Sequence, residues 1–186
     1  MARTESSPGN LGSLAPKFSL KGVDEKIHSL DEVTRGAKAF LVAFICNHFP
    51  YVIAVQDRLI QLQAEFPKET FNLIAINSND SSRYPDDSFD MMKSRALEKN
   101  YNFLYLHDET QEVAKNYGAA CTPDLFLFNR DHRLVYRGRI DDNWKQPELV
   151  TSRDLANGIR LTLEGQSIKA TQYSSMGCSI KWKSTP

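Results

Sequence analysis

The stretch AFLVAFICNHFPYVIAVQDRLIQLQAEF, residues 39–66, decides the fold of this chain. Its first part, Ala39–Ile45, is an unbroken apolar run, which is typical of a strand covered on both faces. Apolar residues then recur at steps of three and four from Val52 to Phe66, as in an amphipathic helix that Pro67 ends. A buried strand that leads directly into a helix is the building unit of parallel α/β sheets.

The rest of the chain continues this alternation of strands and helices. We predict strands over 71–76 and 103–106, helices over 88–99 and from a capping box at 108–111 to Gly118, a hairpin of 125–128 with 134–137, a last helix over 152–165, and an N-terminal hairpin of 15–20 with 27–30. The expected fold is therefore α/β, with a central mixed sheet flanked by helices and an N-terminal hairpin extension.

Length and composition indicate one globular domain. The chain has 186 residues, of which 41% are hydrophobic and 25% charged, as is ordinary for a protein with its own core. Residues 1–13 are rich in Ser, Gly and Asn, and residues 166–186 show no periodicity. We therefore expect a flexible lead over 1–13, the domain over 14–165, and a tail over 166–186 that packs on the domain.

The charge balance and the hydropathy pattern exclude two classes of partner. The 23 basic and 23 acidic residues cancel, so we expect no nucleic-acid partner. We read the basic group Arg130, His132, Arg133, Arg137 and Arg139, and the acidic group Asp80, Asp86, Asp87 and Asp90, as solvated surface. No apolar run reaches the ~20 residues that span a bilayer, and the N-terminus is not a signal peptide, so we expect no membrane partner and a cytoplasmic location.

The chain has three cysteines, Cys46, Cys121 and Cys178, too few and too odd in number for a disulfide framework. Cys46 lies where the first long strand meets the first long helix. Free backbone N–H groups and the helix dipole at such a junction favour thiolate, so we expect a lowered pKa and a nucleophilic sulfur. The alternative is a buried cysteine that serves as a small hydrophobe.

Pro123 stands directly before the strand predicted over 125–128. A cis Thr122–Pro123 bond there would expose the preceding backbone to a substrate chain. A trans proline in an ordinary turn is the commoner arrangement, and the residues alone leave both open.

The order of strands and helices, with Cys46 at the first strand-to-helix turn and Thr122-Pro123 before the later hairpin, resembles the thioredoxin fold. More closely, the sequence resembles thioredoxin-like proteins of the redoxin superfamily, also called the alkyl hydroperoxide reductase/thiol-specific antioxidant superfamily. The resemblance covers Leu14 to Lys183. It is carried by six segments, Ile45–Val52, Asn77–Asp80, Tyr84–Phe89, Cys121–Asp124, Tyr136–Asp142 and the terminal G-C-S-I-K-W-K at 177–183. It implies a thiol oxidoreductase that acts on a disulfide or a peroxide, uses an external thiol reductant and needs no cofactor.

Two positions depart from the patterns of these proteins. The resembled subgroup has a C-N-H-C-P turn, whereas Phe49 stands here in place of the second cysteine. The usual route, in which the second thiol of a C-x-x-C resolves the mixed disulfide, is therefore closed. Peroxiredoxins carry Thr or Ser three residues before the nucleophile, and Ala43 lacks that hydroxyl.

The remaining candidates follow from this resemblance. Cys121 and Cys178 are both candidates for the thiol that resolves Cys46, and either could instead be structural. His48, Phe49, Thr122 and Pro123 are the expected substrate-binding residues, although His48 also fits an exposed loop and Phe49 also fits simple packing. Cys46 and His48 have no third ligand at a convincing spacing, so we expect no metal.

The leading hypothesis is thus a thiol-disulfide oxidoreductase or thiol-dependent peroxidase with Cys46 as its single nucleophile. The alternative is a redox-inactive binding module of the same fold, and a metal-binding protein is a weaker third. The sequence leaves the oligomeric state open.

Overall fold

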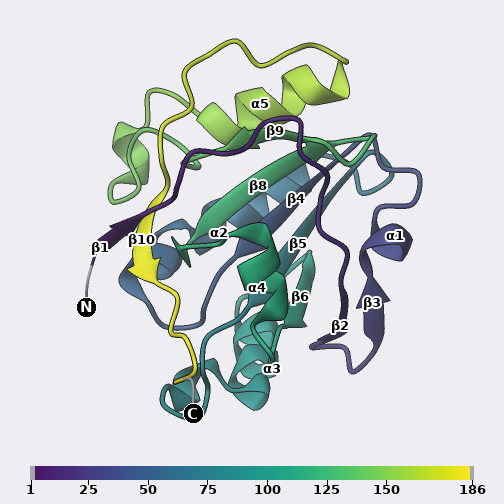
Figure 1. Ribbon diagram of the computed structural model, residues 1–186. Coiled ribbons are helices and arrows are strands. Elements are labelled where there is room, and N and C mark those ends of the chain that lie inside the picture. Colours follow the sequence, from purple (N-terminus) through teal and green to yellow (C-terminus); the bar gives the residue numbers. More distant parts are fainter. Residues whose placement is uncertain (1–2, 185–186) are drawn as a thin grey trace.

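Strand β4 (Ala39–Phe44) occupies the centre of the main sheet because both of its faces are apolar, and every one of its residues is buried. The computed structural model describes residues 3–184 (Figure 1). The main sheet has the strand order β3-β2-β6-β5-β4-β8-β9. The other strands of this sheet are β2 (Ser19–Gly22), β3 (Ile27–Ser29), β5 (Phe71–Asn77), β6 (Leu104–His107), β8 (Asp124–Asn129) and β9 (Leu134–Arg137).

The sheet is mixed, as the alternation of strands and helices predicts. β4, β5 and β6 run parallel, and the register pairs Ala39 with Phe71 and Phe44 with Ile76. β8 runs antiparallel to β4 and forms a hairpin with β9. At the other edge, the predicted N-terminal hairpin is β2 with β3, and β2 joins the sheet through β6.

Alternate residues of β4 enter two separate cores, as the period of a strand requires. Ala39, Leu41 and Ala43 pack with the helices α2 (Pro50–Glu65), α3 (Phe89–Glu98) and α5 (Asp154–Leu163). Phe40, Val42 and Phe44 pack with the helices α1 (Leu30–Val33) and α4 (Glu112–Tyr117) on the opposite face. The sheet is therefore a middle layer between two layers of helices (Figure 1).

Helix α4 begins later than the capping box predicts. Gln111 has a left-handed backbone with φ of 65°, and the helix starts at Glu112. The carboxylate of Asp108 still accepts hydrogen bonds at the helix start, but from the backbone N–H groups of Val113 and Ala114. The predicted box is wrong because the Asp108 side chain reaches five and six residues ahead rather than three.

A second, three-stranded sheet has the order β1-β10-β7. It consists of β1 (Arg3–Glu5), β7 (Cys121–Thr122) and β10 (Met176–Ser179), so it joins the two ends of the chain beside Pro123 (Figure 1). The sequence shows no strand pattern in β1 or β10, which lie within the predicted lead and the predicted tail. The domain boundaries at residues 13 and 165 stay a prediction, and residues 1, 2, 185 and 186 lie outside the described part.

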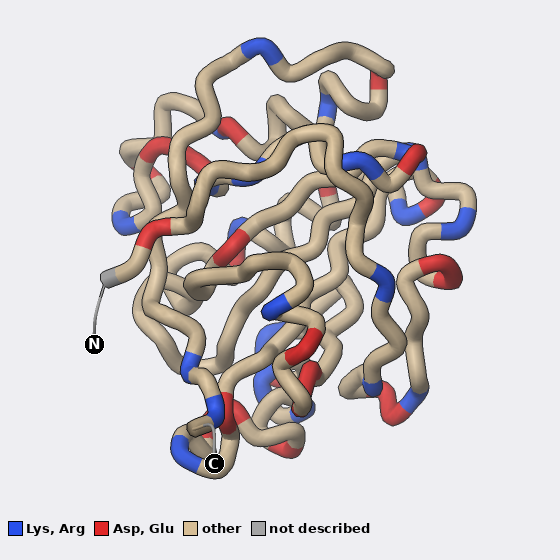
Figure 2. The backbone as a smooth tube through the Cα atoms, viewed as in Figure 1, with Lys and Arg blue, Asp and Glu red and all other residues tan. Residues whose placement is uncertain are grey.

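Charged residues of both signs are interspersed over the molecule (Figure 2). Short 3-10 helices are formed by η1 (Pro85–Asp87) and η2 (Pro147–Leu149). Between residues 3 and 184, no helix is long and apolar enough to cross a membrane.

Both charged groups that the sequence predicts as solvated surface contain buried residues. Arg130 and Arg133 are exposed, but the Arg137 side chain is only 6% exposed and forms a two-pronged ion pair with Asp124. In the acidic group, Asp86 and Asp90 are exposed, whereas Asp80 and Asp87 are buried. The prediction is wrong for these three residues because each has polar partners that sequence periodicity does not reveal.

Candidate active site

Cys46 lies two residues beyond the carboxyl end of β4 and four residues before the first residue of α2. The apolar strand carries the chain out of the core, and Pro50 starts the helix at a position where its missing N–H costs nothing. The Cys46 side chain nevertheless stays inside, and the residue is only 1% exposed. The predicted strand-to-helix position is therefore correct, but the thiol is enclosed.

The Cys46 sulfur lies within hydrogen-bonding distance of one hydroxyl and two backbone N–H groups. The Thr122 hydroxyl oxygen lies 3.3 Å from Sγ. The backbone N–H groups of His48 and Phe49, at the start of α2, also hydrogen-bond the sulfur. These contacts favour a negatively charged sulfur, as the helix-terminus argument predicts.

The buried carboxylate of Asp87 has the opposite effect on the Cys46 sulfur, because its negative charge disfavours a thiolate. Asp87 is fully enclosed beside the turn. Its oxygens accept hydrogen bonds from the backbone N–H of Asn47 at 2.8 Å, from Asn77 Nδ2 at 3.2 Å and from Asn79 Nδ2 at 2.7 Å. Tyr105 in turn donates its hydroxyl to Asn47 Oδ1 at 2.8 Å. This polar cluster, which we call the Asp87 network, holds the turn in place and was not expected from the sequence.

The pKa of Cys46 moves in the direction opposite to the prediction. Burial is the largest cause and the charge of Asp87 the next, and together they raise the pKa of the thiol to about 12. The Thr122 hydroxyl and the two backbone N–H groups lower the pKa, but by less. The expectation of a lowered pKa is therefore wrong, because desolvation outweighs the helix terminus.

His48 and Phe49 lie against the same cluster. The imidazole Nδ1 of His48 is 3.5 Å from Asp87 Oδ2, and the side chain is 28% exposed, so it is only half-buried and faces the carboxylate. Phe49 is 1% exposed and packs in the core that α2 shares with β4. The Lys181 ammonium stands 4.9 Å from the centre of its ring. Phe49 is thus a buried aromatic side chain directly before the first residue of α2.

The Thr122–Pro123 peptide bond is cis, so the trans alternative is wrong. The backbone before it is not free, however, because β7 pairs with β10 and places Cys178 opposite Thr122 and Ser179 opposite Cys121. The chain's own C-terminal strand thus occupies the edge that the sequence leaves open to a substrate chain.

All three cysteines are free thiols and all three are buried. Cys121 directs its Sγ to the carbonyl oxygen of Pro123 at 3.4 Å. Cys178 lies in β10, whose next residues cross the turn and hydrogen-bond Asn79 and Gln111 through the Lys181 backbone. Cys121 lies in β7, Cys178 lies in the paired strand β10, and Cys46 contacts Thr122 of β7. The pairing of β7 with β10 therefore brings the three candidate cysteines into one region.

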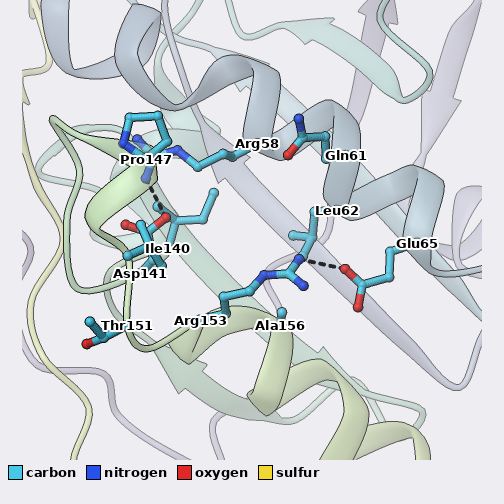
Figure 3. A pocket seen from close by; sticks show the side chains of 11 residues that line it. Arg58, Gln61, Leu62, Glu65, Ile140, Asp141, Pro147, Thr151, Arg153 and Ala156 are labelled. Atoms are coloured by element: carbon cyan, nitrogen blue, oxygen red, sulfur yellow. Dashed lines mark hydrogen bonds and ion pairs between the residues drawn. The ribbon is translucent and has the colours of Figure 1, made fainter.

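A larger cavity lies elsewhere, between α2 and the loop that follows β9. Its volume is about 560 Å³, and its charged side chains are paired, Arg58 with Asp141 and Arg153 with Glu65 (Figure 3). No cysteine lines it within the described residues 3–184. A smaller cavity, about 140 Å³, lies beside Pro123. Its lining includes the apolar side chains of Val55, Trp144 and Met176 and the charged side chains of Arg139, Asp141 and Asp142.

Two solved structures are similar to this chain over nearly its whole length. One is a conserved, uncharacterized protein from Geobacillus kaustophilus, with 43% identity, a TM-score of 0.94, and coverage of 100% of this chain and 99% of that one. The other is a hypothetical protein from Sinorhizobium meliloti 1021, with 37% identity, a TM-score of 0.92, and coverage of 98% and 100%.

A more distant structure shares the fold alone. It is the thioredoxin domain of a thiol-disulfide oxidoreductase from Bacteroides vulgatus, with 17% identity, a TM-score of 0.58, and coverage of 70% of this chain and 89% of that one. No curated protein sequence matches the chain. The Redoxin family model matches residues 10–155, and the chain therefore belongs to the Redoxin family.

Proposed function

We propose that this protein is a thiol oxidoreductase in which Cys46 is the nucleophile. Its substrate is a disulfide or a peroxide, and an external thiol returns the protein to the reduced state. The proposal includes the finer resemblance to the subgroup with the C-N-H-C-P turn and the cytoplasmic location. Membership in the Redoxin family supports the reaction class.

The observation that carries the proposal is the set of groups around the Cys46 sulfur that can donate a hydrogen bond to it. The Thr122 hydroxyl and the N–H groups of His48 and Phe49 converge on one atom at the start of a 16-residue helix. Such donors serve little purpose around a neutral thiol, which accepts hydrogen bonds weakly, but they stabilise a thiolate. The sulfur is therefore prepared for a charged state that it reaches when water or a substrate enters the site.

A substrate can reach the Cys46 sulfur only if the C-terminal segment, formed by β10 and the residues after it up to Lys181, moves away. Cys46 is buried, and β10 covers the Thr122 edge while Lys181 covers Phe49. Displacement of this segment would remove the burial that raises the pKa of Cys46 while leaving the three donors in place. The cavity beside Pro123 then offers room for part of a substrate.

A disulfide fits the site better than a peroxide. Ala43 is fully buried in β4 and has no hydroxyl to hold a peroxide oxygen. Attack on a disulfide needs only a thiolate and a leaving thiol. We therefore place disulfide exchange first and peroxide reduction second.

A redox-inactive binding module is the second candidate. It is favoured by Phe49, which removes one thiol, and by the enclosure that raises the pKa of Cys46 to about 12. In that case Cys46 would be a packing residue, and the fold would bind a partner without electron transfer.

The test is steady-state turnover of a small disulfide, and in parallel of hydrogen peroxide, with dithiothreitol as the electron donor. We expect turnover by the wild-type protein and a fall to the protein-free rate for Cys46→Ser. The matched control is Cys121→Ser, a second buried thiol that should leave the attacking step intact. Absence of turnover by the wild-type protein with either oxidant would favour the binding module.

A further inference from the structure

The register between β7 and β10 separates the two candidate resolving thiols. Directly opposed residues of antiparallel strands place their side chains on the same face, and neighbouring residues of one strand point to opposite faces. Cys178 is opposed to Thr122, whose hydroxyl contacts Cys46 Sγ at 3.3 Å. Cys178 therefore shares the face of Thr122 and Cys46, whereas Cys121 points away from it.

The packing agrees with the register. Cys46 and Cys178 belong to the same buried apolar cluster, together with Phe49, which directly precedes α2, and Val55 of α2. Cys121 points instead to the Pro123 carbonyl oxygen and lies beside the ion pair of Asp124 with Arg137. Thr122 thus connects the two thiols, by its side chain to Cys46 and by strand pairing to Cys178.

The charges around the two thiols point the same way. Burial raises the pKa of both thiols. The Lys181 cation acts to lower the pKa of Cys178. At Cys121 the Asp124 carboxylate raises the pKa further, and the Arg137 cation offsets that rise only in part. A thiol near a cation ionises more readily and attacks a disulfide faster than a thiol near a carboxylate.

We propose that Cys178 is the resolving thiol for Cys46, so that β10 supplies the second sulfur which Phe49 has removed from the turn. The assignment rests on the proposed function and adds the identity of the second thiol. It also explains why a strand near the end of the chain is held against the cis-proline loop.

The reaction balances with the two thiols and one substrate disulfide. The Cys46 thiolate attacks one substrate sulfur, forms a mixed disulfide and releases the other half as a thiolate. The Cys178 thiolate then attacks Cys46 Sγ, forms the Cys46–Cys178 disulfide and releases the second half. The two protons lost by the cysteines end on the two released thiols, and two electrons pass to the substrate. An external dithiol reduces the internal disulfide by the same exchange in reverse.

The strand pairing requires a close approach at Gly177. A Cβ on this residue would stand 2.4 Å from the Thr122 carbonyl oxygen, closer than real contacts allow. Glycine at this position therefore lets β10 lie directly on β7, which brings Cys178 beside the cis-proline loop.

The experiment treats full-length protein with a small excess of dithiobis(nitrobenzoate) and measures released nitrothiobenzoate together with intact and peptide masses. We expect the wild-type protein to release two equivalents per chain and to carry a Cys46–Cys178 disulfide with no adduct. Cys178→Ser should release one equivalent and retain the nitrothiobenzoate adduct on Cys46. Cys121→Ser is the matched control and should behave as the wild type. Cys178→Ala provides a second replacement should the serine variant fail to fold.

The outcomes separate this assignment from the proposed function. A Cys46–Cys121 disulfide, or an adduct-free Cys178→Ser protein that still releases two equivalents, overturns the role of Cys178 while leaving Cys46 as the nucleophile. Release from Cys46→Ser equal to that from the wild type overturns the proposed function itself.

Discussion

The Cys46 sulfur lies 3.3 Å from the Thr122 hydroxyl oxygen, so the residue before the cis proline contacts the thiol at the start of α2 directly. The two residues are 76 positions apart in the chain, and β7 and the end of β4 bring them together. This contact joins the two halves of the candidate site, and its removal is the first test of how the thiol is controlled.

Thr122→Val keeps the shape of the side chain and removes the hydroxyl that lowers the pKa of Cys46. A hydrogen bond to a charged group contributes ~1.5 kcal/mol, so alkylation of Cys46 at neutral pH should slow by about ten-fold. The rate of iodoacetamide modification, followed by peptide mass spectrometry against pH, measures this. Thr122→Ser retains the hydroxyl and should react nearly as the wild type does; equal rates for all three proteins would show that the contact has no influence.

Asp87→Asn should change reactivity and stability in opposite directions. Loss of the carboxylate charge removes a cause of the raised pKa of Cys46, so alkylation at a given pH should quicken. The amide also places an NH₂ group against donors of the Asp87 network, which should cost about 1–3 kcal/mol of the free energy of unfolding in urea. Asp86→Asn, an exposed neighbour, is the control and should leave both quantities unchanged.

Gly177→Val should loosen the C-terminal strand. The added side chain meets the Thr122 carbonyl, so β10 must move from β7 and Cys46 should gain exposure to solvent. We expect alkylation of Cys46 to rise by about ten-fold or more at constant pH, since local opening governs access to buried groups. Ser179→Ala in the same strand adds no clash and is the control. An unchanged alkylation rate in Gly177→Val would mean that β10 does not cover the thiol.

Arg137→Met should destabilise the protein strongly. The guanidinium forms two hydrogen bonds to Asp124, at 3.2 and 2.9 Å, in a site where both side chains are almost entirely buried. Removal of one partner leaves a buried charge without compensation, which costs about 3–5 kcal/mol. Urea unfolding measures this loss, and the double variant Arg137→Met/Asp124→Leu should recover part of it; an unchanged midpoint in the single variant would contradict the role of the pair.

The raised pKa of Cys46 predicts an alkaline loss of stability. The folded protein holds the thiol proton to about pH 12, whereas the unfolded chain releases it near the ordinary thiol pKa of 9.0. The folded state thus binds more protons in this interval, so stability is intact below pH 9 and falls as pH rises, by up to ~1.4 kcal/mol per pH unit from this group. The difference in unfolding free energy between the wild type and Cys46→Ser should narrow or reverse across that range, and a constant difference would contradict the buried-thiol assignment.

The sequence predicts those parts of the fold that local patterns determine. The apolar run of β4 consists of consecutive residues, and the apolar stripe of α2 repeats over consecutive turns of one helix. Both elements form as expected, with Cys46 between them. The strand β10 was missed because Met176–Ser179 has no alternation of its own and becomes a strand only through its pairing with β1 and β7.

The environment of the candidate site depends on partners far apart in the chain. Asp87 is buried because Asn47 and Asn77 donate to it from other elements, and no period in the sequence places these residues together. The pKa of Cys46 likewise depends on residues far apart in the chain. The helix terminus is a local feature that the sequence shows, whereas burial and the charge of Asp87 come from tertiary packing. The sequence therefore places Cys46 correctly at the strand-to-helix junction but predicts the wrong direction for the shift of its pKa.

The most direct test of the central claim is the order in which the three thiols of the wild-type protein react. Limiting dithiobis(nitrobenzoate) is added without reductant, the reaction is quenched by acid at successive times, and the free fraction of each cysteine is measured by differential alkylation and mass spectrometry. We predict that Cys46 loses its free thiol first and that Cys121 remains free throughout. Prior loss of Cys121 or Cys178 while Cys46 stays free would contradict the assignment of Cys46 as the nucleophile.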